Sequence, residues 1–155
     1  MSDALDVCLR LVKAETTLVR RFDNRLGALF GVSLADFLTL LHLGRAEGGR
    51  MRRVDLAEAL GMTASGVTRG LAPLERIGLV VREADARDAR VAYAALTDTG
   101  RERLGELLKA AEQVAAESFA APQWAPQEVD SLGALLTRLG GTGLPRDHSR
   151  AQETL

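Results

Sequence analysis

The stretch Thr63–Glu102 decides the fold, and it reads TASGVTRGLAPLERIGLVVREADARDARVAYAALTDTGRE. It opens with small polar residues, and Thr63 can cap a helix that begins there. Gly78 is well placed to end that helix. Two β-compatible runs follow at residues 79–83 and 90–96, joined by a six-residue polar loop. The stretch therefore predicts a helix followed by a β-hairpin.

Just upstream, the spacing of small and branched residues predicts a helix-turn-helix. Ala57 is small where two helices would meet, and Gly61 suits a tight turn four residues later. Val67 is a β-branched residue that can fill the space between the helices. The face expected to be buried consists of four leucines: Leu56, Leu60, Leu71 and Leu74.

The opposite face of the second helix suits a DNA groove, because short side chains allow the backbone to come close. That face carries Thr63, Ser65, Gly66, Thr68 and Arg69. Arg69 can reach a guanine edge or a phosphate in double-stranded DNA. Taken alone, such a face is also compatible with an ordinary surface helix. The hairpin loop strengthens the DNA interpretation, since Arg87 and Arg90 would meet an adjacent minor groove.

Long helices are expected on both sides of this unit. Apolar residues recur every three or four positions over 5–30, which indicates an amphipathic helix. Residues 34–45 are apolar nearly all round and should be buried, with Ser33 as the N-cap. Helices are also expected at 97–119 and 127–139. Apolar stripes on the terminal helices need a cover, and a second copy of the chain is the simplest one.

Composition limits the classes of function. The chain has 155 residues, 46% of them hydrophobic, and a net charge of −1, which excludes a purely electrostatic nucleic-acid binder. Residues 50–90 contain eight arginines against six acidic residues, a small local excess of positive charge. Lys13 and Lys109 are the only lysines in the sequence. Arginine suits bidentate contacts with phosphate or guanine.

Other classes find little support. The single cysteine, Cys8, excludes an internal disulfide and a cysteine-based zinc site. The sequence shows no secretory signal and no apolar run of membrane-spanning length, so we expect a cytoplasmic protein without a membrane partner. Two histidines, one cysteine and no glycine-rich phosphate loop argue against an enzyme. No catalytic residue, metal site or cofactor is predicted.

The chain resembles the MarR family of winged helix-turn-helix transcriptional regulators. The resemblance extends over about residues 5–139, and four segments in matching order carry it: 65–69 (SGVTR), 74–80 (LERIGLV), 85–90 (DARDAR) and 96–101 (LTDTGR). It implies a mainly α fold with a small β-hairpin, in which N- and C-terminal dimerisation helices flank the winged helix.

The resemblance implies a homodimer, with the helix from Thr63 in the major groove and the Arg87/Arg90 loop alongside. Arg90 matches the family's usual wing arginine, and Asp88 matches the acidic residue that supports it. Three departures stand out. Gly70 and Pro73 should weaken the recognition helix, by a kink or a loose last turn. Ala89 replaces a second arginine often found in the wing.

The expected organisation is one MarR-type domain over 1–140 followed by a flexible tail at 141–155. Within it, about 33–98 form the winged-helix part, and about 4–30 and 98–140 form the dimerisation helices.

Members of the family often respond to a small aromatic or phenolic effector or to an oxidant. An effector pocket would be lined by Phe22, Phe30, Phe37 and His42, although each is also an ordinary core residue. Cys8 is a candidate redox sensor, but a small buried hydrophobe on the apolar stripe is the simpler explanation of that residue. Its usual partner tyrosines are not matched, since Tyr93 is the only tyrosine.

The sequence thus predicts a ligand-responsive repressor that binds a pseudo-palindromic operator as a homodimer. Two alternatives stay open: a thiol-based redox regulator acting through Cys8, and a winged helix used for protein contacts without DNA.

Overall fold

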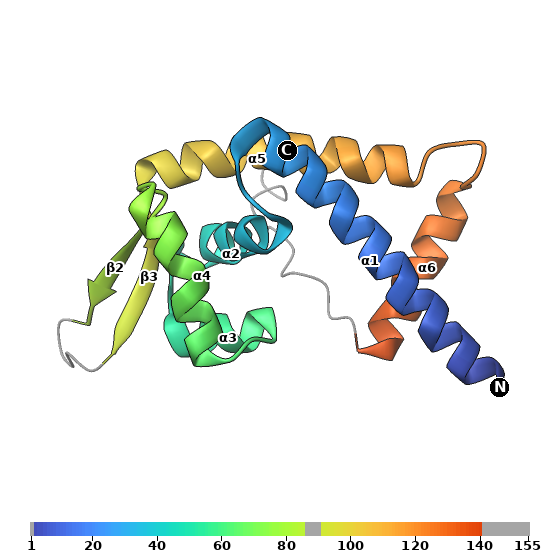
Figure 1. Ribbon diagram of the computed structural model, residues 1–155, viewed down its shortest axis with the longest axis horizontal. Coiled ribbons are helices and arrows are strands. Elements are labelled where there is room, and N and C mark those ends of the chain that lie inside the picture. Colours follow the sequence, from blue (N-terminus) through green and yellow to red (C-terminus); the bar gives the residue numbers. More distant parts are fainter. Residues whose placement is uncertain (1, 86–90, 141–155) are drawn as a thin grey trace, which may run out of the picture.

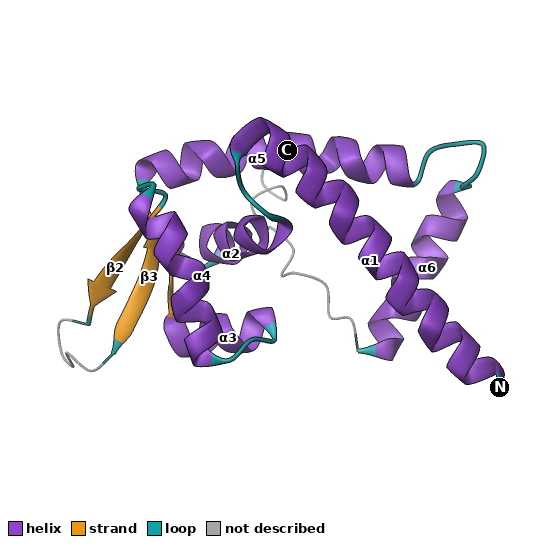
Figure 2. Ribbon diagram, in the orientation of Figure 1, coloured by secondary structure: helices purple, strands orange, loops and turns teal. Residues whose placement is uncertain are grey.

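The computed structural model describes residues 2–85 and 91–140 (Figures 1 and 2). The described residues form six α-helices, one short 3-10 helix (η1) and a small antiparallel sheet. Their bounds in chain order are α1 Asp3–Phe30, α2 Leu34–Arg45, η1 Glu47–Gly49, β1 Arg50–Arg52, α3 Arg53–Leu60, α4 Ala64–Arg76, β2 Val80–Ala84, β3 Ala92–Leu96, α5 Asp98–Ser118 and α6 Pro126–Leu139. The mainly α winged-helix fold expected from the sequence is confirmed.

Helix α2 lies at the centre of the winged-helix part. Ser33 and Asp36 form a reciprocal capping box at its start: the Ser33 hydroxyl accepts from the Asp36 backbone, and the Asp36 carboxylate accepts from the Ser33 backbone at 2.9 Å. Phe37, Leu40 and Leu43 are buried, as the all-round apolar pattern predicts. The helix contacts α1, α3, α4, α5 and the sheet, so it is the support on which the other elements are placed.

The sheet has three strands in the order β1-β3-β2, whereas the sequence predicts only two. The extra strand, β1, pairs antiparallel with β3, opposite residues Tyr93 to Ala95. Three residues are too few to show the alternation by which a strand is recognised. Pairing with β3 supplies the backbone hydrogen bonds that such a short segment lacks by itself.

The helix-turn-helix forms as predicted. Gly61 ends α3 with a left-handed backbone (φ 62°), and Thr63 caps α4. Ala57 and Val67 are both buried where the two helices meet. Helix α4 continues through Pro73 to Arg76, so the proline does not end the helix; a kink at Pro73 stays a prediction.

Hydrogen bonds close the end of α4. The N–H of Ile77 donates to the carbonyl of Pro73 at 3.1 Å, and the N–H of Leu79 donates to the carbonyl of Leu74 at 3.0 Å. Pro73 lies near the C-terminal end of the helix, and these bonds still form beyond it.

Helix α5 links the winged-helix part to the terminal helices, running from β3 at one end toward α6 at the other (Figure 1). Thr97 fixes its start: its hydroxyl donates to the carbonyl of Gly78 at 2.6 Å and accepts from the N–H of Gly100 at 2.9 Å. Gly100 is buried against the backbone of Leu79, where a Cβ would overlap the carbonyl oxygen.

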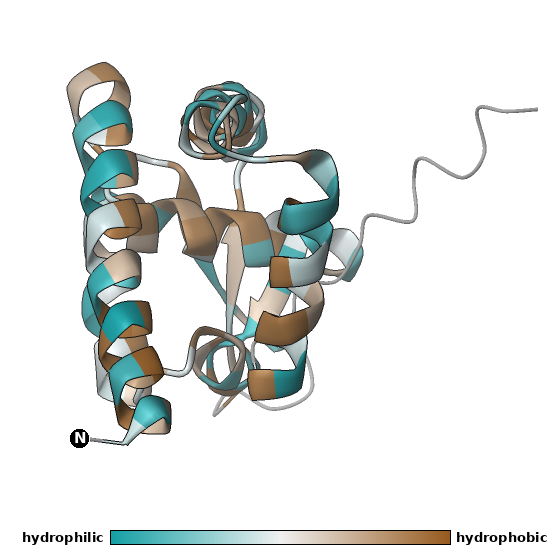
Figure 3. Ribbon diagram, turned by 90° about the vertical axis from the view of Figure 1, so that its right-hand side faces the viewer, coloured by the Kyte–Doolittle hydropathy of each residue, from teal (hydrophilic) through white to brown (hydrophobic). Residues whose placement is uncertain are grey.

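The terminal helices leave apolar surface uncovered. α1 packs on α5 and α2 through its C-terminal half, where Leu26 is fully buried. Large apolar residues are exposed on the N-terminal half of α1 and on α6, which itself has no buried residue. Figure 3 shows hydrophobic residues (brown) alternating with hydrophilic ones (teal) along α1. They are Leu5, Val7, Leu9 and Val12 on α1, and Leu135, Leu136 and Leu139 on α6.

None of the described helices is, by itself, both long and apolar enough to cross a membrane. The helices α1 and α2 meet that criterion only when counted together across an 80° bend, and α2 is a core helix.

Candidate DNA-binding interface

The outer face of α4 is exposed and carries the side chains that the sequence singled out. Ser65, Thr68 and Arg69 are exposed, while the opposite side of the helix is buried through Val67, Leu71 and Leu74. The exposed side therefore offers one arginine and short hydroxyls to a groove.

Two hydroxyls of this face make hydrogen bonds to the backbone of α4. The Thr63 hydroxyl accepts from the N–H of Gly66 at 3.1 Å, which makes Thr63 the N-cap. Thr68 donates to the carbonyl of Ala64 at 3.0 Å. A Cβ on Gly66 would come within 3.2 Å of the Thr63 hydroxyl and the Met62 methyl. Glycine at position 66 therefore lets Thr63 and Met62 pack closely against the first turn of α4.

An ion pair that the sequence did not indicate fixes the two helices of the helix-turn-helix. The guanidinium of Arg53, at the start of α3, lies 2.7 Å from the carboxylate of Glu75 in the last turn of α4. Both side chains are largely covered, at 16% and 32% exposure. Within the described part of the chain, Nε of Arg53 is buried without a hydrogen-bond partner. The pair joins residues 22 positions apart, a separation at which sequence periodicity gives no signal.

The arms of the wing are placed beside α4. β2 and β3 pair from Val80 opposite Leu96 to Ala84 opposite Ala92. Beyond the last strand pair, the N–H of Asp85 donates to the carbonyl of Val91 at 3.1 Å. The hairpin is therefore confirmed, one residue later in β2 than predicted. The wing residues Arg87, Asp88 and Arg90 lie outside the described residues, so their roles stay predictions.

Arg50 and Glu83 form a second polar group on the outer face of the sheet. The Arg50 guanidinium lies 3.1 Å from the Glu83 carboxylate and 4.9 Å from the centre of the Tyr93 ring. The register places these residues on all three strands, so the group ties β1 to the hairpin arms. Without β1 in the prediction, this grouping could not be found from the sequence.

The four residues predicted for an effector pocket come from α1 and α2. Phe37 is buried in the core, and Phe22 and Phe30 pack against it partly exposed. The guanidinium of Arg103 lies 5.5 Å from the centre of the Phe30 ring. His42 is half-buried; its burial and the nearby Arg45 charge lower the pKa of the imidazole below its usual 6.5. Their role in a pocket stays a prediction.

Cys8 is exposed on α1, so its interpretation as a buried hydrophobe is wrong for the single chain. The N-terminal half of α1 extends beyond the core, and no described element covers Cys8 there. Among the described residues, no group of three or more histidine, cysteine or acidic side chains is placed to hold a metal ion.

Comparisons with known proteins agree with this geometry. The MarR family profile matches residues 30–91. Over 129 residues, the chain is 31% identical to YxaD, an uncharacterized HTH-type transcriptional regulator of Bacillus subtilis, and the match covers 80% of this chain and 86% of YxaD. The chain belongs to the MarR family of transcriptional regulators. In this MarR-family chain, the matched region runs from the last residue of α1 through the helix-turn-helix and β2, and it ends at residue 91, just before β3.

Solved structures of MarR-family regulators share the fold. Sco3205 of Streptomyces coelicolor, determined in complex with DNA, has a TM-score of 0.81 and 25% identity, covering 90% of this chain and 88% of Sco3205. BpsR of Bordetella bronchiseptica, whose DNA binding is regulated by 6-hydroxynicotinic acid, has a TM-score of 0.78 and 22% identity, covering 92% of this chain and 99% of BpsR. The MarR-type arrangement thus includes the terminal helices as well as the matched region.

Proposed function

We propose that this chain binds a pseudo-palindromic DNA site as a homodimer and thereby represses transcription. One observation carries the proposal: α4 buries one side completely and presents Ser65, Thr68 and Arg69 on the other, beside a hairpin. Helix α4 would lie in the major groove, where Arg69 contacts a base edge or a phosphate. Arg87 and Arg90 would contact the backbone or the neighbouring minor groove, with Asp88 supporting the loop.

The uncovered apolar surface of the terminal helices supports the homodimer. Leu5, Leu9 and Val12 recur at helical spacing on α1, and Leu135 and Leu139 do so on α6. Exposed apolar stripes of this length mark interaction surfaces in soluble proteins. A two-fold dimer built on them would present two copies of α4, and its operator would have half-sites about one helical turn apart.

A small ligand is proposed to control DNA binding. The DNA binding of BpsR is regulated by an aromatic acid, and that protein shares this fold. The aromatic set Phe22, Phe30 and Phe37 with His42 lies where α1 and α2 meet the core, so it is one candidate place for an effector. An oxidant acting on Cys8 is the second candidate signal, favoured by the exposure of that thiol.

Selection of bound fragments from random duplex DNA tests the proposal. We expect an enriched site with two-fold pseudo-symmetry. Its affinity should fall steeply with salt concentration, because phosphate contacts release counterions. A winged helix used only for protein contacts would enrich no sequence and show no such salt dependence. Repeating the selection with phenolic ligands and with peroxide distinguishes the two signals.

A further inference from the structure

The ion pair between Arg50 and Glu83 spans the middle strand of the sheet. In the order β1-β3-β2, Arg50 lies on one outer strand and Glu83 on the other, and their charged groups are 3.1 Å apart. We infer that Arg50 is a positioning residue, which holds the hairpin arms, and with them the wing, at a fixed angle to α4. The inference rests on the proposed function, because it concerns how the wing meets DNA.

The pair lies where the sheet narrows from three strands to two. β1 pairs with β3 as far as Tyr93, whereas β2 pairs with β3 on to Ala92, opposite Ala84. Beyond Tyr93, among the described strands, the hairpin continues with β2 and β3 alone. Two-stranded ribbons twist more strongly than wider sheets and are only marginally stable by themselves. Because Glu83 lies opposite Tyr93, a contact to Glu83 acts on the angle at which the arms leave the sheet.

Tyr93 adds a contact from the middle strand. The Arg50 guanidinium lies 4.9 Å from the centre of the Tyr93 ring, within the range of cation–π contacts. Arg50 therefore contacts both arms of the hairpin. The side chains of Arg50 and Glu83 are 51% and 41% exposed, so the pair should contribute little to the global free energy of unfolding. Its effect should instead be local to the arms.

The segment that carries Arg50 is also fixed to α4. Arg52 ends β1 and Arg53 begins α3, and the Arg53 guanidinium lies 2.7 Å from the Glu75 carboxylate of α4. Residues 50–53 thus carry an ion pair to the hairpin and another to the recognition helix. Because one short segment contacts both of the elements proposed to bind DNA, it sets their relative position.

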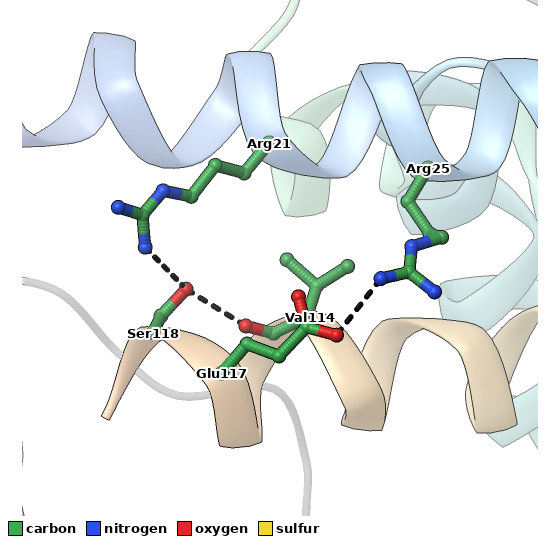
Figure 4. Close-up of polar contacts among 5 residues, drawn as sticks. All are labelled: Arg21, Arg25, Val114, Glu117 and Ser118. Carbon is green, nitrogen blue, oxygen red and sulfur yellow. Dashed lines mark hydrogen bonds and ion pairs between the residues drawn. The ribbon is translucent and has the colours of Figure 1, made fainter. Parts of the chain in front are cut away.

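Hydrogen exchange of the free protein tests the contact without DNA. In Arg50→Ala, the amides that pair β2 with β3 should exchange at least about threefold faster than in the native protein, the size expected for an exposed ion pair combined with a cation–π contact. Arg25→Ala is the matched control: Arg25 pairs with Glu117 at 2.8 Å and joins α1 to α5, away from the strands (Figure 4). The arms should exchange at the native rate in the control.

DNA affinity tests the consequence for the wing. Arg50→Ala and Glu83→Ala should each weaken binding to the selected operator and to a scrambled duplex at least about threefold, with the discrimination between them unchanged. Glu83→Ala gives the sharper result. Removing a carboxylate should by itself favour binding to phosphates, so weaker binding is expected only if Glu83 acts through Arg50. The charge-exchanged variant Arg50→Glu/Glu83→Arg keeps the native net charge and should recover most of the affinity.

The effect of Arg50 should also depend on the wing arginine. In an Arg90→Ala background, Arg50→Ala should cause no further loss of affinity, because the contact that it positions is already absent. Losses that combine independently would overturn the inference. So would unchanged exchange of the arms in Arg50→Ala, equally fast exchange in Arg25→Ala, undiminished binding by Glu83→Ala, or a charge-exchanged variant that stays weak. A native protein that binds no duplex would contradict the proposed function, and faster exchange in Arg50→Ala would still support its role in holding the arms.

Discussion

At the scale of single residues, Gly100 shows how one missing side chain permits the fold. It lies in the first turn of α5 against the carbonyl of Leu79, which also accepts a bond from the N–H of Thr97 at 3.2 Å. A backbone oxygen cannot move aside as a flexible side chain can. The close approach of α5 to the sheet therefore requires glycine.

Gly100→Ala should lower the free energy of unfolding by about 1–3 kcal/mol, because the added methyl group overlaps backbone. Gly105→Ala is the control on the same helix: nothing lies within 4 Å of its Cβ position, so the change should stabilise the protein by up to about 1 kcal/mol. Urea denaturation measures both. Equal effects of the two substitutions would contradict the close-approach argument.

His42 predicts a pH dependence of stability. Its pKa is lowered in the folded state by burial and by Arg45, so the unfolded chain takes up a proton more readily as the pH falls through 6.5. The stabilising contribution of neutral His42 to the folded state is fully present above pH 6.5, and it is lost as the pH falls from there toward the lowered pKa. The free energy of unfolding should therefore differ less between about pH 8 and about pH 5 in His42→Gln than in the native protein. Denaturation curves at the two pH values measure this difference. An unchanged difference would exclude His42 as the source.

At the scale of elements, the ion pair between α3 and α4 sets the geometry of the helix-turn-helix. Arg53 and Glu75 are mostly covered, so removing one partner leaves the other charge poorly solvated. Glu75→Ala should therefore destabilise the protein by about 1–3 kcal/mol.

Asp6→Ala is the matched control, because the Asp6–Arg10 pair has a similar distance but its arginine is 79% exposed. Solvent-exposed ion pairs contribute about 0–1 kcal/mol to the free energy of unfolding. Thermal unfolding of the two variants tests the comparison. If Asp6→Ala were as costly as Glu75→Ala, burial would not be what gives the α3–α4 pair its importance.

The elements also show what the sequence can predict. Caps at Ser33, Thr63 and Thr97 and the turn at Gly61 are local signals, and each was found where expected. β1 was missed because its stability comes from β3, some forty residues away in the chain. The continuity of α4 through Pro73 depends on hydrogen bonds in its last turn, which helix propensity alone does not describe.

At the scale of the whole molecule, the exposed leucines of α6 predict a dimer interface. Leu139→Glu should raise the dissociation constant of the dimer at least about tenfold, because a carboxylate is buried without a partner. Thr137→Glu places the same charge on the opposite side of the helix and should have little effect. Light scattering across a dilution series measures both. Equal dissociation in the two variants would place the interface elsewhere.

Some groups of residues can be recognised from the sequence, and others only from the structure. The residues proposed to contact DNA lie close together in the sequence, on α4 and in the hairpin loop, so their pattern is visible there. The Arg50–Glu83 pair joins the two outer strands of the sheet, and the Arg53–Glu75 pair joins two helices. Such groupings depend on packing between distant segments, which single-sequence periodicity does not encode.

In the proposed complex, α4 reads the DNA sequence while the wing contacts the DNA backbone. The most direct test measures the affinity of the native protein, Arg69→Ala and Arg90→Ala for the selected operator and for a scrambled duplex. Arg69→Ala should reduce discrimination between the two by about 1–3 kcal/mol, and Arg90→Ala should weaken both by about 1 kcal/mol or more. If discrimination is unchanged in Arg69→Ala, that residue does not read bases; if the native protein also fails to discriminate, the account of α4 is wrong.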